Sequence, residues 1–397
     1  MQGMGSFNVV TPSAPTQLAV ETISLADMNL ANLVLHVVTV DGVITWRQQV
    51  KLPAQGAPET SAFGQAMAMT DSTLVIGAAR SGALSGVVYI FARNGANWVE
   101  QTKLYAMDGD LAGRGFGSAV AIFGDVVAVG APNDDRMGAN TGAVYVFNRS
   151  GSNWYPQGKV VISNGRAGDL FGSAVSVYGT TVLVGAPGRN SAYVFTRDSR
   201  NQWGLQSTIS RGGLFGTAVA LKGAQAYIGA PGYSNQGVVF VFNMSLDPVK
   251  QTQVWTLAQT LMTTSEMQAG NGDLFGSSLA FDGNRLVVGA PGYNGVYNGS
   301  VYYEIGSAWV FEMTGWTLEA RLTTYDALPE SEAQSNVLSG HHFGASVAIS
   351  GNYVLVGAPD FDQVSMDQGA VYLFAYLPAA NGVAGTWARS GRLVSNA

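Results

Sequence analysis

Residues that could carry chemistry are scarce in this chain. It has three histidines and no cysteine among 397 residues. Without cysteine it can form no disulfide, no thiolate metal site and no cysteine nucleophile. His341 and His342 are adjacent, so in an extended segment their rings point to opposite sides. The chain therefore has few histidines from which to build a metal site or a Ser-His-Asp triad, and we predict no catalytic residue.

Acidic residues form two small clusters, each directly after a Gly-Ala-Pro sequence. Asp134 and Asp135 make up the first, and the second consists of Asp360, Asp362 and Asp367. Oxygen-rich loops of this kind can hold calcium. Short Asp/Asn loops more often form Asx turns, however, so no cofactor is predicted and calcium stays open at these five residues.

Further carboxylates stand shortly before Phe-Gly dipeptides, at Asp110, Asp169 and Asp273. We expect them to cap turns rather than to react. Glycosidase chemistry needs two carboxylates at a defined separation, which the sequence does not reveal. No motif supports that chemistry here.

The composition excludes several partners. Charged residues are 12% of the chain, the net charge is −6 and no basic run occurs, so we predict no nucleic-acid partner. No stretch approaches 18 apolar residues, so no membrane span is expected. The first residues lack the basic and apolar regions of a signal peptide. A weakly charged surface rich in glycine (51 residues) is typical of exported proteins or of subunits packed in an assembly.

The elements that must position these residues come from a repeat. Six copies of Phe-Gly are each followed by Gly-Ala, which begins 14 residues after the Phe. The Phe-Gly copies begin at Phe63, Phe116, Phe171, Phe215, Phe275 and Phe343. Their separations vary from 44 to 68 residues. A fixed internal distance within a variable period indicates a rigid unit joined by loops of free length.

Each copy contains the pattern of a four-stranded meander. Between Phe-Gly and Gly-Ala, small and branched apolar residues alternate around an x-Gly pair, which predicts a tight hairpin. A triplet such as Tyr145-Val146-Phe147 follows as the third strand. The fourth contains a Trp with Leu, Val or Ile six residues later, as in Trp98 and Leu104. Because six is even, we expect those two side chains to face the same side.

Small residues in the inner strands and bulky ones in the outer strands predict β-propeller blades. We therefore predict an all-β fold, a single seven-bladed propeller domain over residues 1–397 with four-stranded antiparallel blades. The first blade, 6–52, is degenerate, and the others span 63–104, 116–160, 171–209, 215–261, 275–322 and 343–393. We expect the two chain ends to pair and close the ring.

The paired Phe-Gly and Gly-Ala-Pro motifs, followed by sequences such as GAVYVFNRSGSNW, resemble the FG-GAP repeat of the integrin α-subunit head. The resemblance covers residues 63 to 393 and, more weakly, begins near 33. It implies an integrin-like propeller used in adhesion. Integrin repeats often carry a D-x-D-x-D-G calcium loop between the two motifs, whereas this chain has a tight turn there, such as Gly124-Asp125. The family's calcium sites therefore do not carry over.

Recognition is expected where the spacing is free, in the connections between strands 2 and 3 and between strands 4 and 1. The longest lie at 292–307 and 323–342. Tyrosine-rich loops suit contact surfaces. The candidate binding residues there and in the following blade are Tyr293, Tyr297, Tyr302, Tyr303, Tyr325, His341, His342 and Phe361. The alternative is that these side chains only cover loop backbone.

The sequence is compatible with three functions. The first is a non-enzymatic extracellular or cell-surface module that binds a protein or a glycan through its variable loops. The second is a carbohydrate-active enzyme or lectin with at least two converging carboxylates at the channel mouth. The third is a structural subunit of a surface filament or particle, as a homo- or hetero-assembly.

Overall fold

The computed structural model describes thirteen segments of the chain: residues 7–9, 22–23, 33–40, 43–52, 61–80, 86–109, 114–249, 252–263, 272–297, 300–324, 339–361, 369–379 and 385–394. Candidate residues Tyr325, Asp362 and Asp367, and the turn residue Asp110, lie outside these segments. The described part is almost entirely β, with two short 3-10 helices, η1 (Pro187–Arg189) and η2 (Tyr233–Asn235). No helix in the described residues is long and apolar enough to cross a membrane.

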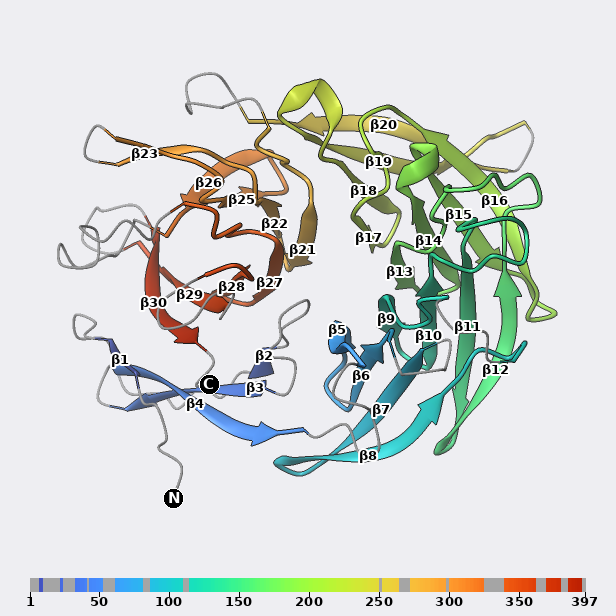
Figure 1. Ribbon diagram of the computed structural model, residues 1–397, viewed down its shortest axis with the longest axis horizontal. Helices are drawn as coiled ribbons and strands as arrows, with labels where there is room; N and C mark the ends of the chain where they lie inside the picture. Colours follow the sequence, from blue (N-terminus) through green and yellow to red (C-terminus); the bar gives the residue numbers. More distant parts are fainter. Residues whose placement is uncertain are drawn as a thin grey trace. The chain divides into compact units, whose positions relative to one another are not determined.

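Six sheets are antiparallel four-stranded meanders, as predicted, and are blades of a β-propeller fold (Figure 1). Four of them form one compact unit, residues 54–267 with 274–277. Its first two blades are β5 (Phe63–Met69), β6 (Thr73–Ala78), β7 (Val87–Asn94) and β8 (Asn97–Leu104), then β9 (Ala119–Phe123), β10 (Val126–Ala131), β11 (Ala143–Ser150) and β12 (Asn153–Val160). The next two are β13 (Ala174–Tyr178), β14 (Thr181–Ala186), β15 (Ser191–Arg197) and β16 (Trp203–Ser210), then β17 (Val219–Lys222), β18 (Gln225–Ala230), β19 (Val238–Leu246) and β20 (Gln253–Leu261).

The second compact unit holds residues 1–53, 268–273 and 278–397. It contains the last two blades, β21 (Ser278–Asp282), β22 (Arg285–Ala290), β25 (Ser307–Glu312) and β26 (Thr317–Leu322), then β27 (Ser346–Ser350), β28 (Tyr353–Ala358), β29 (Ala370–Leu377) and β30 (Thr386–Val394). A separate hairpin, β23 (Gly295–Tyr297) and β24 (Ser300–Tyr302), emerges from the connection between β22 and β25.

The prediction of seven blades is wrong in its count, because the N-terminal segment does not fold as a meander. Its strands are β1 (Phe7–Val9), β2 (Thr22–Ile23), β3 (Leu33–Val40) and β4 (Val43–Lys51), in the order β1-β4-β3-β2. The outer hairpin β3–β4 is present, but β1 pairs on the far side of β4. This segment lacks the Phe-Gly and Gly-Ala pair, so no inner hairpin is specified.

The Phe-Gly dipeptide lies at the centre of a β-turn. The N–H of Ser118 donates to the carbonyl of Gly115 at 3.0 Å, and the same bond recurs from Ser173 to Leu170. The glycine of each dipeptide has φ between +92° and +97°, as the third residue of a type II turn requires. Phe116 is fully buried and packs edge-on against the Tyr145 ring, 5.2 Å away. The glycine of the dipeptide thus allows the positive φ of the turn, and the phenylalanine fixes the turn to the core.

Gly-Ala glycines are needed for a different reason, the close approach of the next blade. A Cβ on Gly130 would lie 2.0 Å from the carbonyl oxygen of Gly172, which belongs to the following Phe-Gly. The same clash, at 1.9–2.0 Å, would arise at Gly77, Gly185, Gly229 and Gly289. Backbone therefore packs directly on backbone from one blade to the next, and the two motifs are partners across this interface.

The hydrophobic cores lie between neighbouring blades. One cluster combines Val75, Val88 and Leu104 of the first blade with Phe116 and Val129 of the next. Strands such as β6 and β10 are buried along their whole length because both faces of the sheet are covered. These strands accordingly read as continuous apolar runs.

The expectation that Trp and Leu of the fourth strand share a face is wrong. Opposite Trp98 lies Arg93, and opposite Leu104 lies Val88, five residues away and hence on the other face. A β-bulge lies between them, and it recurs in all six blades and in the β3–β4 hairpin. The extra residue inverts the alternation. Trp therefore packs on the preceding blade and Leu on the following one, as Trp154 and Leu104 do.

A polar bond accompanies this arrangement on the outer strands. The indole Nε1 of Trp255 donates to Gln206 Oε1 of the preceding blade at 3.0 Å, and Trp154 donates to Gln101 Oε1 at 3.4 Å. Trp387 donates to Glu319 Oε2 in the same way, at 3.1 Å. The acceptors are the residues that the bulge leaves unpaired. The bulge thus directs a side chain to the next blade.

We predict that Gly130→Ala destabilises the protein by at least about 2 kcal/mol, because the new Cβ would overlap backbone that cannot move independently. Gly204→Ala is the matched control, since a Cβ there meets no atom within 4 Å and the φ angle is not positive. It should leave the free energy of unfolding within about 0.5 kcal/mol. Urea denaturation of both variants checks this, and equal effects would contradict the backbone-contact explanation.

Candidate functional site

Five of the six described blades bring two residues beside each other where strand 2 ends and strand 1 is about to begin. The first residue stands two before Phe-Gly and the second 20 residues later, four after the glycine of Gly-Ala. A backbone bond joins the two connections: the N–H of Asn133 donates to the carbonyl of Arg114 at 3.1 Å, and Gly292 donates to Asp273 at 3.1 Å. The resulting pairs are Arg114/Asp134, Asp169/Arg189, Gly213/Tyr233, Asp273/Tyr293 and His341/Phe361.

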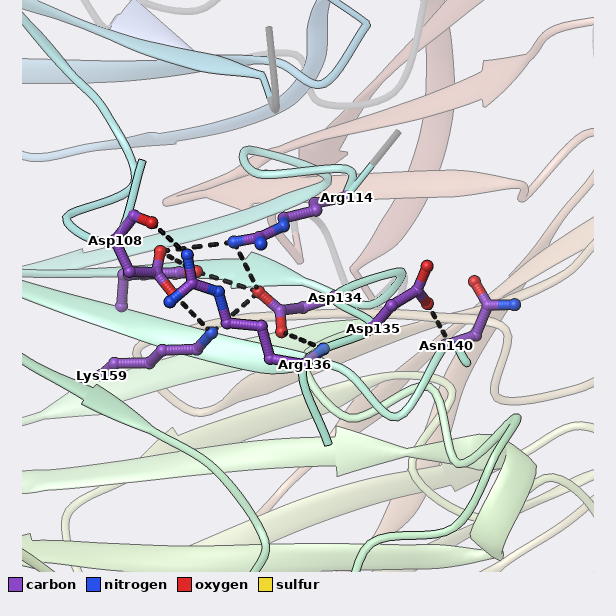
Figure 2. A network of polar contacts seen from close by, with 8 residues as sticks. Asp108, Arg114, Asp134, Asp135, Arg136, Asn140 and Lys159 are labelled. Atoms are coloured by element: carbon purple, nitrogen blue, oxygen red, sulfur yellow. Dashed lines mark hydrogen bonds and ion pairs between the residues drawn. The ribbon is translucent and has the colours of Figure 1, made fainter. Parts of the chain in front are cut away.

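The blade β9–β12 fills this position with a network of charges (Figure 2). Asp134 is almost fully buried, with 1% of its side chain exposed, and its Oδ2 atom lies 3.3 Å from Arg114 Nη1. Lys159 at the end of β12 places its Nζ atom 2.8 Å from Asp134 Oδ2 and 2.8 Å from Asp108 Oδ2. Two connections, β8–β9 and β10–β11, and the end of β12 therefore meet at these charges.

Tyr145 and Arg136 complete the network. The Tyr145 hydroxyl lies 2.9 Å from Asp108 Oδ1 and 3.0 Å from Asp134 Oδ2. Arg136 Nη1 lies 3.0 Å from Asp108 Oδ2, and its side chain is 42% exposed. We call Asp108, Arg114, Asp134, Arg136, Tyr145 and Lys159 the charge network.

The network sets the protonation of its members. Burial disfavours ionisation of Asp108, but hydrogen bonds from Lys159 and Tyr145 and the charges of Lys159 and Arg136 outweigh it and lower the pKa of Asp108 below 3.8. Burial, followed by the hydrogen bond to Asp108, raises the pKa of Tyr145 far above 10. Asp108 is therefore a carboxylate and Tyr145 a neutral phenol at physiological pH.

The next blade carries the same pair reversed. Asp169 Oδ2 lies 3.0 Å from Arg189 Nη1, and that nitrogen also donates to the carbonyl of Asn164 at 2.9 Å. Asp169 also accepts the backbone N–H of Arg166 at 2.7 Å, which agrees with the turn-capping role expected for it.

A second group forms in the two-blade unit, where two long connections lie side by side. The N–H of Gly340 donates to the carbonyl of Tyr303, at 3.0 Å, and His342 donates to Glu304, at 3.1 Å. The His342 ring lies between two carboxylates, with Nδ1 2.5 Å from Asp360 Oδ2 and Nε2 3.7 Å from Glu304 Oε2. We call residues 293–297, 300–306, 339–342 and 358–361 the hairpin corner.

Within the hairpin corner, three candidate binding residues are buried. Tyr293 is 1% exposed and accepts a hydrogen bond from Arg321 Nη1 at 2.7 Å. His341 is 2% exposed and packs edge-on against Phe361, itself 5% exposed, with ring centroids 4.9 Å apart. These side chains fill the position beneath the loops, as their 20-residue spacing dictates, and present little area to a partner.

The remaining candidates include the exposed ones. Tyr303 is 65% exposed, His342 and Tyr302 are partly exposed, and Tyr297 lies in β23. Val296 and Val301 are opposite one another across the β23–β24 hairpin and are 46% and 54% exposed. Apolar side chains thus project from the β23–β24 hairpin, which lies in the variable connection 292–307.

The acidic candidates for metal binding already have protein partners. Asp134 belongs to the charge network, Asp135 Oδ1 accepts the N–H of Asn140 at 2.6 Å, and Asp360 holds His342. Among the described residues no group of three or more His, Asp or Glu side chains is arranged to hold a metal ion.

The sequence did not single out Asp108, Arg114, Arg136, Tyr145 and Lys159 as a group. A signal was present: positions defined by the distance from Phe-Gly and Gly-Ala are constant, so Arg114 and Asp134 could have been paired by comparing repeats. Asp108 gave no such signal, because it lies in a connection of variable length.

We predict that Asp108→Asn lowers the free energy of unfolding by roughly 1–3 kcal/mol at neutral pH, since Lys159 and Arg136 lose a charged acceptor. The Asp108 pKa is depressed in the folded state, so its stabilisation is complete above about pH 4 and is lost as the pH falls through the folded-state value. The difference between wild type and variant should therefore shrink in acid. Denaturation at several pH values measures it, with the exposed Asp125→Asn as a control of small effect.

Comparison with known proteins agrees with the repeat. The family model described as FG-GAP repeat matches residues 46–91, 98–147, 154–195, 258–311 and 333–374, more than half of the chain. No curated protein matches.

Solved structures show the fold alone. A putative 6-phosphogluconolactonase from Bacteroides fragilis is similar with a TM-score of 0.55 and 10% identity, over 97% of this chain and 100% of that one. A protein from Lactobacillus plantarum is similar with a TM-score of 0.53 and 13% identity, over 91% and 93% of the two chains. Because the repeat model matches most blades and those blades are four-stranded antiparallel meanders, the chain belongs to the FG-GAP repeat family of β-propellers.

Proposed function

We propose that this chain is a non-enzymatic binding module that recognises a protein partner at the hairpin corner. The observation that carries the proposal is the β23–β24 hairpin, whose Val296, Val301 and Tyr303 are 46%, 54% and 65% exposed. Exposed aliphatic side chains beside an exposed tyrosine suit a protein surface, where aromatic anchors dominate binding. A glycan, the other partner class considered, would use the tyrosine rather than the valines.

The placement of the hairpin supports this function. It stands on a base fixed by backbone bonds to the neighbouring connection, such as Phe343 N–H to the Ile305 carbonyl at 3.1 Å. The His342 contacts with Asp360 and Glu304 join a third loop to that base. A variable loop on a rigid scaffold is the common arrangement for recognition sites. An extracellular or cell-surface location, as in other adhesion proteins of this fold, belongs to the same proposal.

The carbohydrate-active alternative finds less support. The lactonase-like structure shares only the fold, and a fold does not determine a reaction. The two carboxylates that converge, Asp108 and Asp134, are both held by Lys159 and Tyr145. A general acid needs a raised pKa, whereas that of Asp108 is lowered.

The assembly alternative rests on the outer strands of the four-blade unit. Val99, Tyr155, Leu205 and Leu257 project from β8, β12, β16 and β20 and are between 46% and 53% exposed. Such side chains on outer strands could pack against a second copy. Concentration-dependent light scattering that Leu205→Ser abolishes would favour this function over the first.

A crosslinking experiment tests the binding function. A photoreactive phenylalanine analogue replaces Tyr303 in the full chain, in cells of the source organism, and the same analogue replaces Leu205 in a second strain. We expect Tyr303 to yield one discrete crosslinked protein that Leu205 does not. With that protein purified, Val301→Ser and Tyr303→Ser should each weaken binding by about tenfold or more, and Leu205→Ser should not.

Two outcomes contradict the proposal. Equal products from both positions would show that the hairpin corner is not selective, and absence of any product from Tyr303 would show that it makes no stable contact. A glycan array bound only by chains with an intact Tyr303, and indifferent to Val301→Ser, would assign the site to a glycan instead.

A further inference from the structure

The charge network contains a buried nitrogen that no described residue contacts through a hydrogen bond. Arg114 is 3% exposed, and its Nη1 atom lies 3.4 Å from Asp108 Oδ1 and 3.3 Å from Asp134 Oδ2. Its Nη2 atom is buried and has no hydrogen-bond partner among the residues that the structure describes. A charged donor left unsatisfied in the interior destabilises the folded state, and a ligand that accepts its hydrogens would remove that cost.

The network is also unbalanced in charge. Its three cations, Arg114, Arg136 and Lys159, face two carboxylates, Asp108 and Asp134. The two carboxylates make their shortest contacts with Lys159, at 2.8 Å, so the guanidinium of Arg114 is held more loosely. A further acid, Asp135, turns toward Asn140 and away from the cations (Figure 2). Among the described residues, one positive charge of the network therefore remains uncompensated.

The neighbouring blade, β13–β16, does not share this charge imbalance. At the same position Asp169 and Arg189 form a one-to-one pair, and the Arg189 nitrogen has a second acceptor in the Asn164 carbonyl. The repeat can thus bury a balanced pair with the same geometry. The surplus in the blade β9–β12 comes from the additional Arg136 and Lys159.

Solvent reaches the network from the Arg136 side. The Arg136 side chain is 42% exposed, while Asp108 and Lys159 are 18% and 19% exposed. An anion arriving there would meet Arg136, which contacts the same Asp108 carboxylate as Arg114, at 3.0 Å and 3.4 Å. Guanidinium groups bind planar carboxylates through paired N–H donors, which matches an Nη2 atom with two free hydrogens.

We propose that Arg114 and Arg136 form a binding subsite for a small carboxylate. The ligand is one carboxylate group, free or carried on a small molecule, that neutralises the surplus charge and accepts the unused Arg114 hydrogens. This subsite lies in the four-blade unit and does not depend on the partner proposed for the hairpin corner.

Titration of the full chain with sodium acetate, at constant ionic strength maintained with sodium chloride, tests the subsite. Binding is followed by the ¹H–¹⁵N signals of arginine side chains in the wild-type protein. We expect a saturable shift of the Arg114 signals, while those of Arg189 stay in place. Sodium sulfate in a parallel titration distinguishes carboxylate preference from general oxyanion binding.

Variants give the second measurement. Arg136→Gln should weaken acetate binding by about tenfold, because one charge-assisted contact is lost. Arg189→Gln, the matched control in the next blade, should leave the affinity unchanged. Arg136 is exposed, so its replacement is expected to preserve the fold even if Arg114→Gln does not.

Three results would overturn the inference. They are the absence of any Arg114 shift up to high acetate concentration, a linear shift that does not saturate, and an affinity equal in wild type and Arg136→Gln. Tighter binding of sulfate than of acetate would reject a carboxylate ligand.

Discussion

Backbone-to-backbone contact between blades is the constraint on which this structure depends. The α-carbon of each Gly-Ala glycine from Gly77 to Gly289 faces the carbonyl of the next Phe-Gly glycine, with no room for a Cβ. This contact fixes how closely two sheets approach, and the apolar clusters between blades fill the space that it defines. The 14-residue spacing is constant because it measures the hairpin that joins the two halves of the contact.

The same constraint separates scaffold from chemistry. Positions counted from Phe-Gly and Gly-Ala are held in place, yet the residues there differ between blades, from an ion pair at Arg114/Asp134 to an edge-on ring contact at His341/Phe361. The fold specifies that two side chains meet but not which ones. A blade can thus acquire a charged site or a purely apolar one without changing its strands.

Much of the fold could be predicted from the sequence, because local rules decide it. Glycine at positive φ, alternation in the inner strands and the Trp-to-Leu spacing each depend on a few neighbouring residues. The N-terminal sheet could not be predicted, since without its own Phe-Gly the order of its strands depends on tertiary pairing. The prediction that Trp98 and Leu104 share a face of the strand was wrong, because a single bulged residue inverts the alternation. For the sites, the loops at 292–307 and 323–342 were identified, but burial of Tyr293 and His341 follows from packing that composition does not reveal.

The hydrogen bond between tryptophan and glutamine on the outer strands affects how blades can be added to such a protein by duplication. Three of the five matched family segments begin at Trp46, Trp98 and Trp154 and end at Phe91, Phe147 and Phe195. Each of these three spans the last strand, in chain order, of one sheet and the first three strands of the next. Gln101, which accepts the hydrogen bond from Trp154, lies in one segment, and Trp154 is the first residue of the next. Duplication of a segment therefore inserts a blade whose junctions on both sides are already complementary. The segment that repeats therefore carries the contact between two blades rather than one whole sheet. The number of blades can change while the interface between neighbouring blades stays the same.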